Sequence, residues 1–276
     1  MPYALNKNVR LYWEEHGSGP PVLLIMGLSF THEMWFRLLP ALSARYRAIS
    51  FDNRGMGRSD CPSGPYSIRR MAQDAATVMD AAGASSAHVV GASMGGMIAQ
   101  ELALRSPKRV RSLLLACTSH SGLFGAWPHF RYAPHIQRVR RATRAEREHA
   151  LRRFLYATST PPERIDEDVR VRCQCAWNHR GFWSQLAGIL AWSAYGRLPR
   201  IKVPTVVIHG AEDHLVPPEN GRVVASRIPS ARFHLMPDAG HLLMTDQPEL
   251  CTEMLLDFLD EQTREQTASE AGRAIS

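Results

Sequence analysis

The sequence predicts an α/β protein in which a mostly parallel, twisted sheet is flanked by helices and carries a helical insertion. Short apolar runs alternate with stretches of helical periodicity along most of the chain. Because these runs are apolar on both faces, the sheet that they form is expected to be covered by helices on both sides. The chain has 276 residues, of which 45% are hydrophobic and 21% charged, so it is long enough to bury one large core.

Each strand is predicted from a short apolar or alternating run, and each helix from apolar residues that recur with the helical period. Gly83 follows the first helix, where glycine commonly ends helices, and Asp246 is predicted to cap the last helix together with Glu249. The predicted strands are 9–15, 22–26, 46–51, 87–91, 110–116, 205–209 and 232–236, and the predicted helices are 68–82, 94–105, 219–227 and 246–259.

The alternation of strands and helices is interrupted at residues 121–196. This segment is rich in arginine and aromatic residues and has no strand-like run. It is predicted to form a helical lid over the carboxyl edge of the sheet, where open α/β folds keep their sites. The α/β core is therefore assigned to residues 1–120 and 197–262, and the small, polar and charged residues 263–276 are predicted to be a disordered tail.

Charge and composition narrow the classes of partner and location. The formal net charge is +7, but the arginines concentrate in the predicted lid with acidic residues among them, which is typical of a solvated helix face. No nucleic-acid-binding motif accompanies them, so we expect no nucleic-acid partner. No signal pattern opens the chain, and its longest apolar stretch, near residues 21–28, is too short to cross a bilayer. The five cysteines lack metal-binding spacing, so we expect a cytoplasmic protein with reduced thiols, no metal and no membrane association.

The most informative motif is Gly-x-Ser-x-Gly at residues 91–95, centred on Ser93. A predicted strand leads into it and a predicted helix leads out, which is the context of a nucleophile elbow. The glycines leave room for the strand and the helix to approach closely, so the serine hydroxyl is expected to be exposed at the end of the sheet. Ser93 is therefore predicted to be a nucleophile, and the alternative is a tight turn with an inert serine.

A serine nucleophile needs a base, and the base needs an acid that orients it and stabilises its charge. Asp213 and His241 each lie in a loop beyond the carboxyl end of a predicted strand, in the chain order serine, acid, histidine. They are predicted to be the acid and the base. Glu212 and Asp238 stay possible acids, and His209, within its strand, is interpreted as a core histidine.

The negative charge that develops during acyl transfer needs two N–H donors. Met94, directly after the nucleophile, is predicted to supply one. Leu28 is predicted to supply the other, because Gly27 permits a sharp turn that points this N–H inward. Residues 52–59 follow another strand but lack the ending of a phosphate loop, so they are interpreted as a structural turn in which Arg54 buttresses the site.

With these motifs, the chain resembles the α/β-hydrolase fold superfamily, and is similar to its lid-bearing esterases, enol-lactone hydrolases, cofactor-free perhydrolases and carbon–carbon bond hydrolases. The resemblance covers residues 9–120 and 197–262, and residues 93–100 are closest to the 3-oxoadipate enol-lactone hydrolase group. Met26 departs from the family, which usually has histidine there, but the expected donor is a backbone N–H and its function should survive. The resemblance rests on residues 26–28, 52–59, 91–96 and the loops that carry Asp213 and His241.

The residues and the resemblance lead to one functional expectation: a serine hydrolase that cleaves a carboxylic ester or lactone through an acyl-enzyme, without a cofactor. The aromatic lid suggests a small hydrophobic or aromatic substrate, which Trp127, Trp183 and Trp192 are predicted to contact; packing within the lid is the alternative. Carbon–carbon bond hydrolysis and perhydrolysis would use the same triad. A receptor-like binder with negligible turnover is a further alternative, and the sequence leaves the oligomeric state open.

Overall fold

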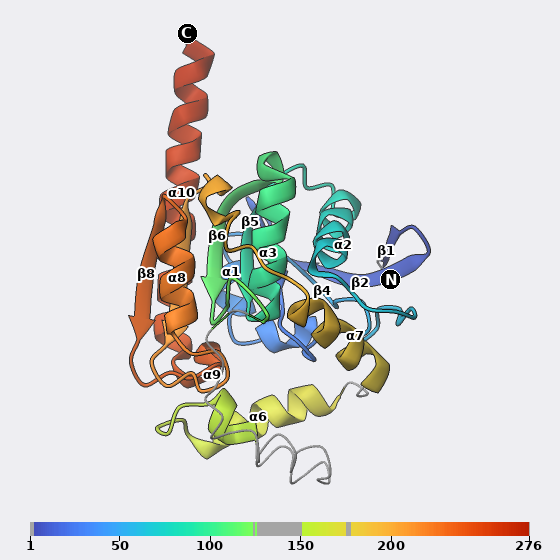
Figure 1. Ribbon diagram of the computed structural model, residues 1–276. Helices are drawn as coiled ribbons and strands as arrows, with labels where there is room; N and C mark the ends of the chain where they lie inside the picture. The colour runs from blue at the N-terminus through green and yellow to red at the C-terminus, as the bar shows by residue number, and fades with distance from the viewer. Residues whose placement is uncertain (1–2, 124, 126–150, 175–177, 276) are drawn as a thin grey trace.

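The computed structural model describes residues 3–123, 125, 151–174 and 178–275, and these residues contain one eight-stranded sheet (Figure 1). The strand order is β1-β2-β4-β3-β5-β6-β7-β8. The β1–β2 and β2–β4 pairs are antiparallel and all other pairs are parallel, so the predicted α/β class is confirmed. The strands are β1 Tyr3–Asn6, β2 Val9–His16, β3 Pro21–Ile25, β4 Arg47–Phe51, β5 Ala87–Ala92, β6 Val110–Ala116, β7 Thr205–Gly210 and β8 Ala231–Met236.

Helices cover both faces of the sheet. One hydrophobic cluster joins the sheet to α2, α3 and α8, and a second joins it to α1, α9 and α10. In β3, Leu23 and Ile25 belong to the first cluster whereas Val22 and Leu24 belong to the second, which is why apolar residues run without interruption along this strand. The helices are α1 Leu39–Ser43, α2 Ile68–Ala81, α3 Met94–Arg105, α6 Pro162–Cys173, α7 His179–Leu190, α8 Glu219–Arg227, α9 Leu243–Asp246 and α10 Pro248–Ile275.

The last helix differs from its prediction at both ends. α10 begins at Pro248, because proline suits a first helical position, and Asp246 instead ends the short helix α9 and is buried. α10 continues to Ile275, so the prediction of a disordered tail over 263–276 is wrong for the described residues. The residues after Thr263 are rich in glutamate, alanine and arginine, which favour a helix and extend one that is already packed. In Figure 1 this end of α10 projects beyond the sheet.

The described part of the predicted lid is helical and lies at the carboxyl end of the sheet. Residues 151–155 form a helical turn, and Figure 1 shows α6 and α7 at the end to which the arrows of β6 and β8 point. Ser121 and Ser193 form an antiparallel bridge, so the two ends of the segment lie side by side. Its action as a lid stays a prediction. In the part of the chain that the structure describes, no helix combines the length and the apolar character needed to cross a membrane.

His88, on β5, is a buried histidine whose protonation is linked to folding. Its Nδ1 lies 2.8 Å from the Ser112 hydroxyl. Burial, with a smaller contribution from Arg111, lowers its pKa from 6.5 to about 4. In the unfolded chain the imidazole takes up its proton near pH 6.5, so the unfolded state binds more protons between these two values. His88 therefore contributes stability that is fully present above pH 6.5 and is lost as the pH falls towards 4.

The substitution His88→Asn is expected to flatten this dependence, because asparagine keeps a polar atom facing Ser112 and does not titrate. Between pH 7.5 and 4.5, the free energy of unfolding of the wild type should fall by about 2–3 kcal/mol more than that of the variant. Denaturant unfolding at the two pH values measures the difference, in which all other titrating groups cancel. Equal losses in the two proteins would show that His88 is not the linked group.

Candidate active site

Ser93 lies in the sharp turn between β5 and α3. Its backbone has φ 55° and ψ −120°, a conformation that residues with a side chain rarely adopt. A Cβ atom on Gly91 would lie 2.4 Å from the Gly95 carbonyl oxygen, and one on Gly95 would lie 2.0 Å from that of Ile25. Only glycine permits this approach of strand and helix. The turn has the strained geometry expected of a nucleophile elbow, and Ser93 is partly exposed there.

Residues 116–118, at the end of β6 and just after it, link this turn to the loop of the predicted base. The Ser93 N–H donates to the Ala116 carbonyl at 2.8 Å, and the Thr118 hydroxyl donates to the Ser93 carbonyl at 2.7 Å. The neighbouring Cys117 thiol donates to the carbonyl of Gly240 at 3.6 Å. The same short segment therefore contacts both the serine turn and the histidine loop, although they are far apart in the sequence.

Asp213 and His241 are buried and hydrogen-bonded, with Nδ1 2.8 Å from Oδ2. The other carboxylate oxygen accepts the N–H groups of Leu215 and Val216 at 3.0 and 2.8 Å. Burial opposes ionisation of Asp213 most strongly, but the charge of His241 and the hydrogen bonds from His209 and His241 outweigh it and hold the pKa of the carboxyl well below its usual range. Asp213 is thus ionised at neutral pH, and the Nδ1 nitrogen of His241 carries the proton of their hydrogen bond.

The two alternative acids lie in other surroundings. Asp238 is exposed and has a left-handed backbone, with φ 50°. The carboxylate of Glu212 accepts both the N–H and the hydroxyl of Thr158, at 2.9 and 2.8 Å. Of the three carboxylates considered from the sequence, the one bonded to His241 is Asp213.

His209 is buried within β7, as predicted for a core histidine, but it also contacts the predicted acid. Its Nε2 lies 2.7 Å from the Val216 carbonyl oxygen and 3.3 Å from Asp213 Oδ2. The thiol of Cys117 is near the same carboxylate, and burial together with the charge of Asp213 raises its pKa well above the usual value. The contact between His209 and Asp213 was not predicted from the sequence. The feature that indicates it is the position of His209 near the end of β7, four residues before Asp213.

The histidine loop is tied to the predicted lid. The Leu242 N–H donates to the Leu155 carbonyl at 2.7 Å. Asp246 accepts the Gly240 N–H at 2.7 Å on one oxygen and the Thr160 hydroxyl at 2.5 Å on the other. Burial raises the pKa of Asp246 to about 6. Asp246, predicted only as a helix cap, therefore holds the loop against the segment above the sheet.

The turn after β3 lies directly against the serine. A Cβ atom on Gly27 would come within 3.1 Å of Ser93 Cβ, so glycine allows the turn to pack this closely. Asn53 Nδ2 donates to the Met26 carbonyl at 2.9 Å. The Asn53 side chain therefore holds the Met26 peptide in place before the turn. Met26 is the residue at which the sequence departs from the family that it resembles.

The predicted oxyanion donors lie on the two sides of this contact. Met94 is the first residue of α3, so its N–H has no intrahelical acceptor, and Leu28 follows the turn glycine. Gln185 on α7 reaches the same turn: its Oε1 accepts the Ser29 N–H at 3.4 Å, and its Nε2 donates to the Arg54 carbonyl at 2.9 Å. Helix α7 therefore packs against the turn that carries Leu28.

Two charged side chains of residues 52–59, those of Asp52 and Arg54, are engaged inside the protein. Arg54 is buried and paired with Asp74 through two contacts of 2.5 Å. Asp52 lies 2.7 Å from His32 Nδ1 and accepts the Arg58 N–H at 2.9 Å. These internal contacts agree with the interpretation of the run as a structural turn that Arg54 buttresses.

The three predicted substrate-binding tryptophans differ in their surroundings. Trp183, on α7, is 53% exposed and packs edge-on against Phe182. Trp192 is only 8% exposed, belongs to the core cluster beside α3, and donates its indole N–H to Glu101 at 2.9 Å. The prediction of Trp192 as a substrate contact is therefore corrected to core packing, because its ring and its N–H are already used. Trp127 lies outside the described residues.

The substitutions Trp192→Ala and Trp183→Ala are expected to separate these roles. Removing the buried ring should cost about 3–5 kcal/mol of stability and lower activity on small and bulky esters alike. Removing the exposed ring should leave the melting temperature nearly unchanged. If Trp183 contacts the substrate, kcat/KM should fall about 5- to 100-fold for a bulky ester but little for p-nitrophenyl acetate. An unchanged kcat/KM for both esters in Trp183→Ala would remove Trp183 from the substrate site.

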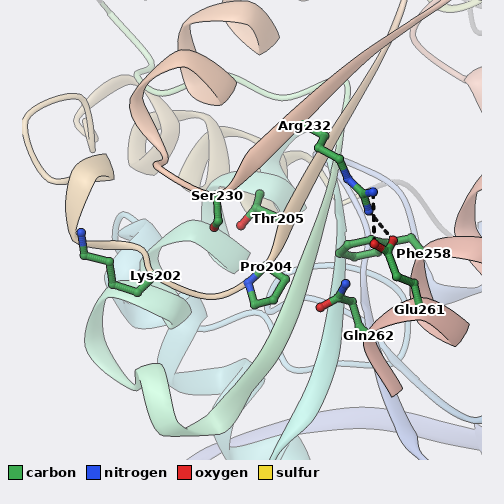
Figure 2. Close-up of a pocket in the computed structure, with 8 residues that line it drawn as sticks. All are labelled: Lys202, Pro204, Thr205, Ser230, Arg232, Phe258, Glu261 and Gln262. Atoms are coloured by element: carbon green, nitrogen blue, oxygen red, sulfur yellow. Dashed lines mark hydrogen bonds and ion pairs between the residues drawn. The ribbon is translucent and has the colours of Figure 1, made fainter. Parts of the chain in front are cut away.

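A cavity of about 260 Å³ lies away from these residues, at the amino ends of β7 and β8 (Figure 2). Arg232 and Glu261, which line it, form an ion pair at 2.5 Å. None of the predicted site residues lines this cavity, so it is not the predicted active site. Its lining residues are Lys202, Pro204, Thr205, Ser230, Arg232, Phe258, Glu261 and Gln262.

Known proteins resemble this chain in both sequence and architecture. The model of the alpha/beta hydrolase family matches residues 16–253. A protein named "Putative carbamate hydrolase RutD" from Azorhizobium caulinodans is 37% identical over 270 residues, which are 95% of this chain and 99% of the relative. The crystal structure of the enol-lactonase from Burkholderia xenovorans LB400 is 27% identical with a TM-score of 0.80, over 94% of this chain and 100% of that one. A thermophilic esterase from Thermogutta terrifontis is also 27% identical with a TM-score of 0.80, over 95% and 97% of the two chains.

Proposed function

Because the chain belongs to the alpha/beta hydrolase family, we propose that it is a serine hydrolase that cleaves a carboxylic ester or lactone. The observation that carries the proposal is the buried hydrogen bond between Asp213 and His241, at the same sheet edge as a serine in a strained strand-to-helix turn. An ionised acid that holds one histidine nitrogen leaves the other free to take a proton from a serine hydroxyl. This arrangement suits nucleophilic acyl transfer.

In the proposed reaction, the Ser93 oxygen attacks the carbonyl carbon while His241 Nε2 accepts the hydroxyl proton. Asp213 keeps its hydrogen bond to Nδ1 and stabilises the imidazolium that forms. The N–H groups of Leu28 and Met94 stabilise the oxyanion. When the tetrahedral intermediate collapses, the bond to the alkoxide breaks, and the alkoxide takes the proton from His241. In a lactone, this alkoxide remains attached to the acyl group.

Water completes the cycle. It loses a proton to His241 and attacks the acyl carbon, and a second tetrahedral intermediate forms. Its collapse releases the carboxylic acid, and Ser93 recovers its proton from the imidazolium. The proposed steps use protein groups and water alone. We propose a small hydrophobic or aromatic substrate, because the exposed ring of Trp183 offers apolar contact on the helix that also reaches the Leu28 turn.

A carbamate is a second candidate substrate class, favoured by the likeness to the RutD relative over nearly the whole chain. Its carbonyl carbon would be attacked in the same way, and a carbamoyl group would replace the acyl group on Ser93. The nitrogen next to this carbonyl makes it less electrophilic than an ester, so slower formation and hydrolysis of the covalent intermediate are expected.

A substrate panel tests the proposal. The purified protein is assayed with p-nitrophenyl esters of increasing chain length, a lactone and a p-nitrophenyl carbamate, with Ser93→Ala as the control. Turnover of esters or the lactone that the control lacks supports the proposal. Faster turnover of the carbamate favours the second candidate. Halogenation that depends on peroxide would point to a perhydrolase, and tight ligand binding without turnover would replace the proposal by a receptor-like role.

A further inference from the structure

We infer that His209 is a positioning residue of the triad: a neutral imidazole, protonated on Nε2, that fixes the Asp213 carboxylate towards His241. This inference rests on the proposed function, because it gives the acid of that reaction a second partner. The sequence assigned His209 to the core alone.

The contacts of Nε2 determine where the proton lies. This nitrogen is 2.7 Å from the Val216 carbonyl oxygen and 3.3 Å from Asp213 Oδ2. Both oxygens only accept hydrogen bonds when the carboxylate is ionised, so Nε2 must carry a proton. The shorter bond goes to the carbonyl and the longer one to the carboxylate. The Nε2–H group of His209 therefore links the Asp213 carboxylate to the backbone carbonyl of Val216, three residues further along the chain.

The surroundings of Nδ1 determine the charge of the ring. A Cβ atom on Gly221 would come within 2.5 Å of Nδ1, so the backbone of α8 packs closely against it. Among the described residues, Nδ1 has no hydrogen-bond partner, and the side chain is fully buried. A proton on Nδ1 would be a buried donor without an acceptor, which is costly. The favoured form is therefore the neutral ring with its proton on Nε2.

A neutral partner suits the acid of a triad. Asp213 receives two backbone N–H groups on Oδ1, and His241 and His209 on Oδ2. Because His209 brings a hydrogen bond without a full positive charge, the negative charge of Asp213 remains available to the imidazolium of His241. The bond to the Val216 carbonyl also holds the turn that supplies the two N–H groups, so the carboxylate cannot rotate freely.

Two substitutions of similar polarity test the roles of the two ring nitrogens separately. The amide nitrogen of His209→Gln reaches towards the position of Nε2, whereas that of His209→Asn reaches only towards Nδ1. We expect His209→Gln to retain kcat for an ester substrate within about threefold, whereas His209→Asn and His209→Leu lose about 10- to 100-fold, with KM within about twofold. Fluorophosphonate titration of Ser93 counts the folded, reactive fraction, and kcat is expressed per titrated site.

The acidic limb of the pH profile of kcat/KM gives a readout that a packing role would not change. In His209→Asn, the hydrogen bond from Nε2 to the Asp213 carboxylate is lost, so this carboxylate stabilises the imidazolium of His241 more strongly. The acidic limb of the kcat/KM profile should therefore move to higher pH in His209→Asn, and it should stay in place in His209→Gln. The Cys117 thiol also faces the acid but stays protonated, because its pKa is raised well above the usual value. Asp246 near the histidine loop titrates alike in all variants. An equal loss of kcat in His209→Gln and His209→Asn, or no loss of kcat in either variant, would overturn the inference.

Nuclear magnetic resonance with ¹⁵N-labelled histidine tests the tautomer without any activity. The His209 signals, assigned by their absence in His209→Gln, should show a neutral ring with its proton on Nε2 under the conditions of the activity assay. A ring that is charged, or protonated on Nδ1, would overturn the inference even in an active enzyme. Conversely, failure of the substrate panel with the expected tautomer present would count against the proposed function and leave the assigned hydrogen bonds in place.

Discussion

Replacement of Ser93 by alanine is expected to lower kcat for an ester substrate by about 10⁶-fold, the loss measured when a triad serine is removed from another serine hydrolase. Alanine has no hydroxyl to attack the carbonyl, so the acyl-enzyme cannot form. The turn itself should tolerate the change, because alanine is no larger than serine and the close contacts at the turn involve the glycines. The melting temperature of the variant should therefore stay close to that of the wild type.

Covalent labelling identifies the nucleophile directly. A fluorophosphonate should modify Ser93 and no other serine of the folded protein, because only an activated hydroxyl reacts quickly. Intact-mass and peptide analysis of wild type and Ser93→Ala measure the stoichiometry and the position of the label. A label on another serine, or a folded protein that is not labelled, would reject Ser93 as the nucleophile.

Asp213→Asn is expected to lower kcat by about 10³- to 10⁴-fold, or roughly 4–5.5 kcal/mol of barrier. The ionised acid keeps the proton of His241 on Nδ1 and stabilises the imidazolium. An asparagine amide can donate to Nδ1, which would move the proton to Nε2, the nitrogen that must accept one from Ser93. The loss should appear in kcat more than in KM, because binding of the substrate does not require the charge.

Asp238→Asn is the matched control for this substitution. Asp238 precedes the same histidine by three residues but is exposed, so its replacement should leave kcat nearly unchanged. Steady-state kinetics of both variants with the same ester decide whether Asp213 or Asp238 is the acid. A larger loss in Asp238→Asn than in Asp213→Asn would move the acid to Asp238 and require the loop to rearrange in solution.

Much of the fold follows from local patterns. All the predicted strands are present. The central strands β3 to β7 are buried and have apolar runs, whereas the outer strands β2 and β8 are partly exposed and alternate between apolar and polar residues. The edge strand β1 was not predicted, because it is only four residues long and lies at the edge of the sheet, beside β2. The far end of α10 was also missed, because polar composition alone does not distinguish a disordered tail from the extension of a packed helix.

The sequence by itself determined the fold class and predicted the chain positions of the proposed serine, acid and base, because an apolar strand followed by a glycine turn is encoded within a few residues. Only the tertiary structure decided which carboxylate meets His241, which oxygens lie beside Nε2 of His209, and that Trp192 belongs to the core. The pairs responsible are distant in the chain: Asp213 and His241 are 28 residues apart, and Trp192 and Glu101 are 91 apart. Periodicity shows which face of an element is buried, whereas hydrogen-bond partners depend on what the fold brings opposite that face.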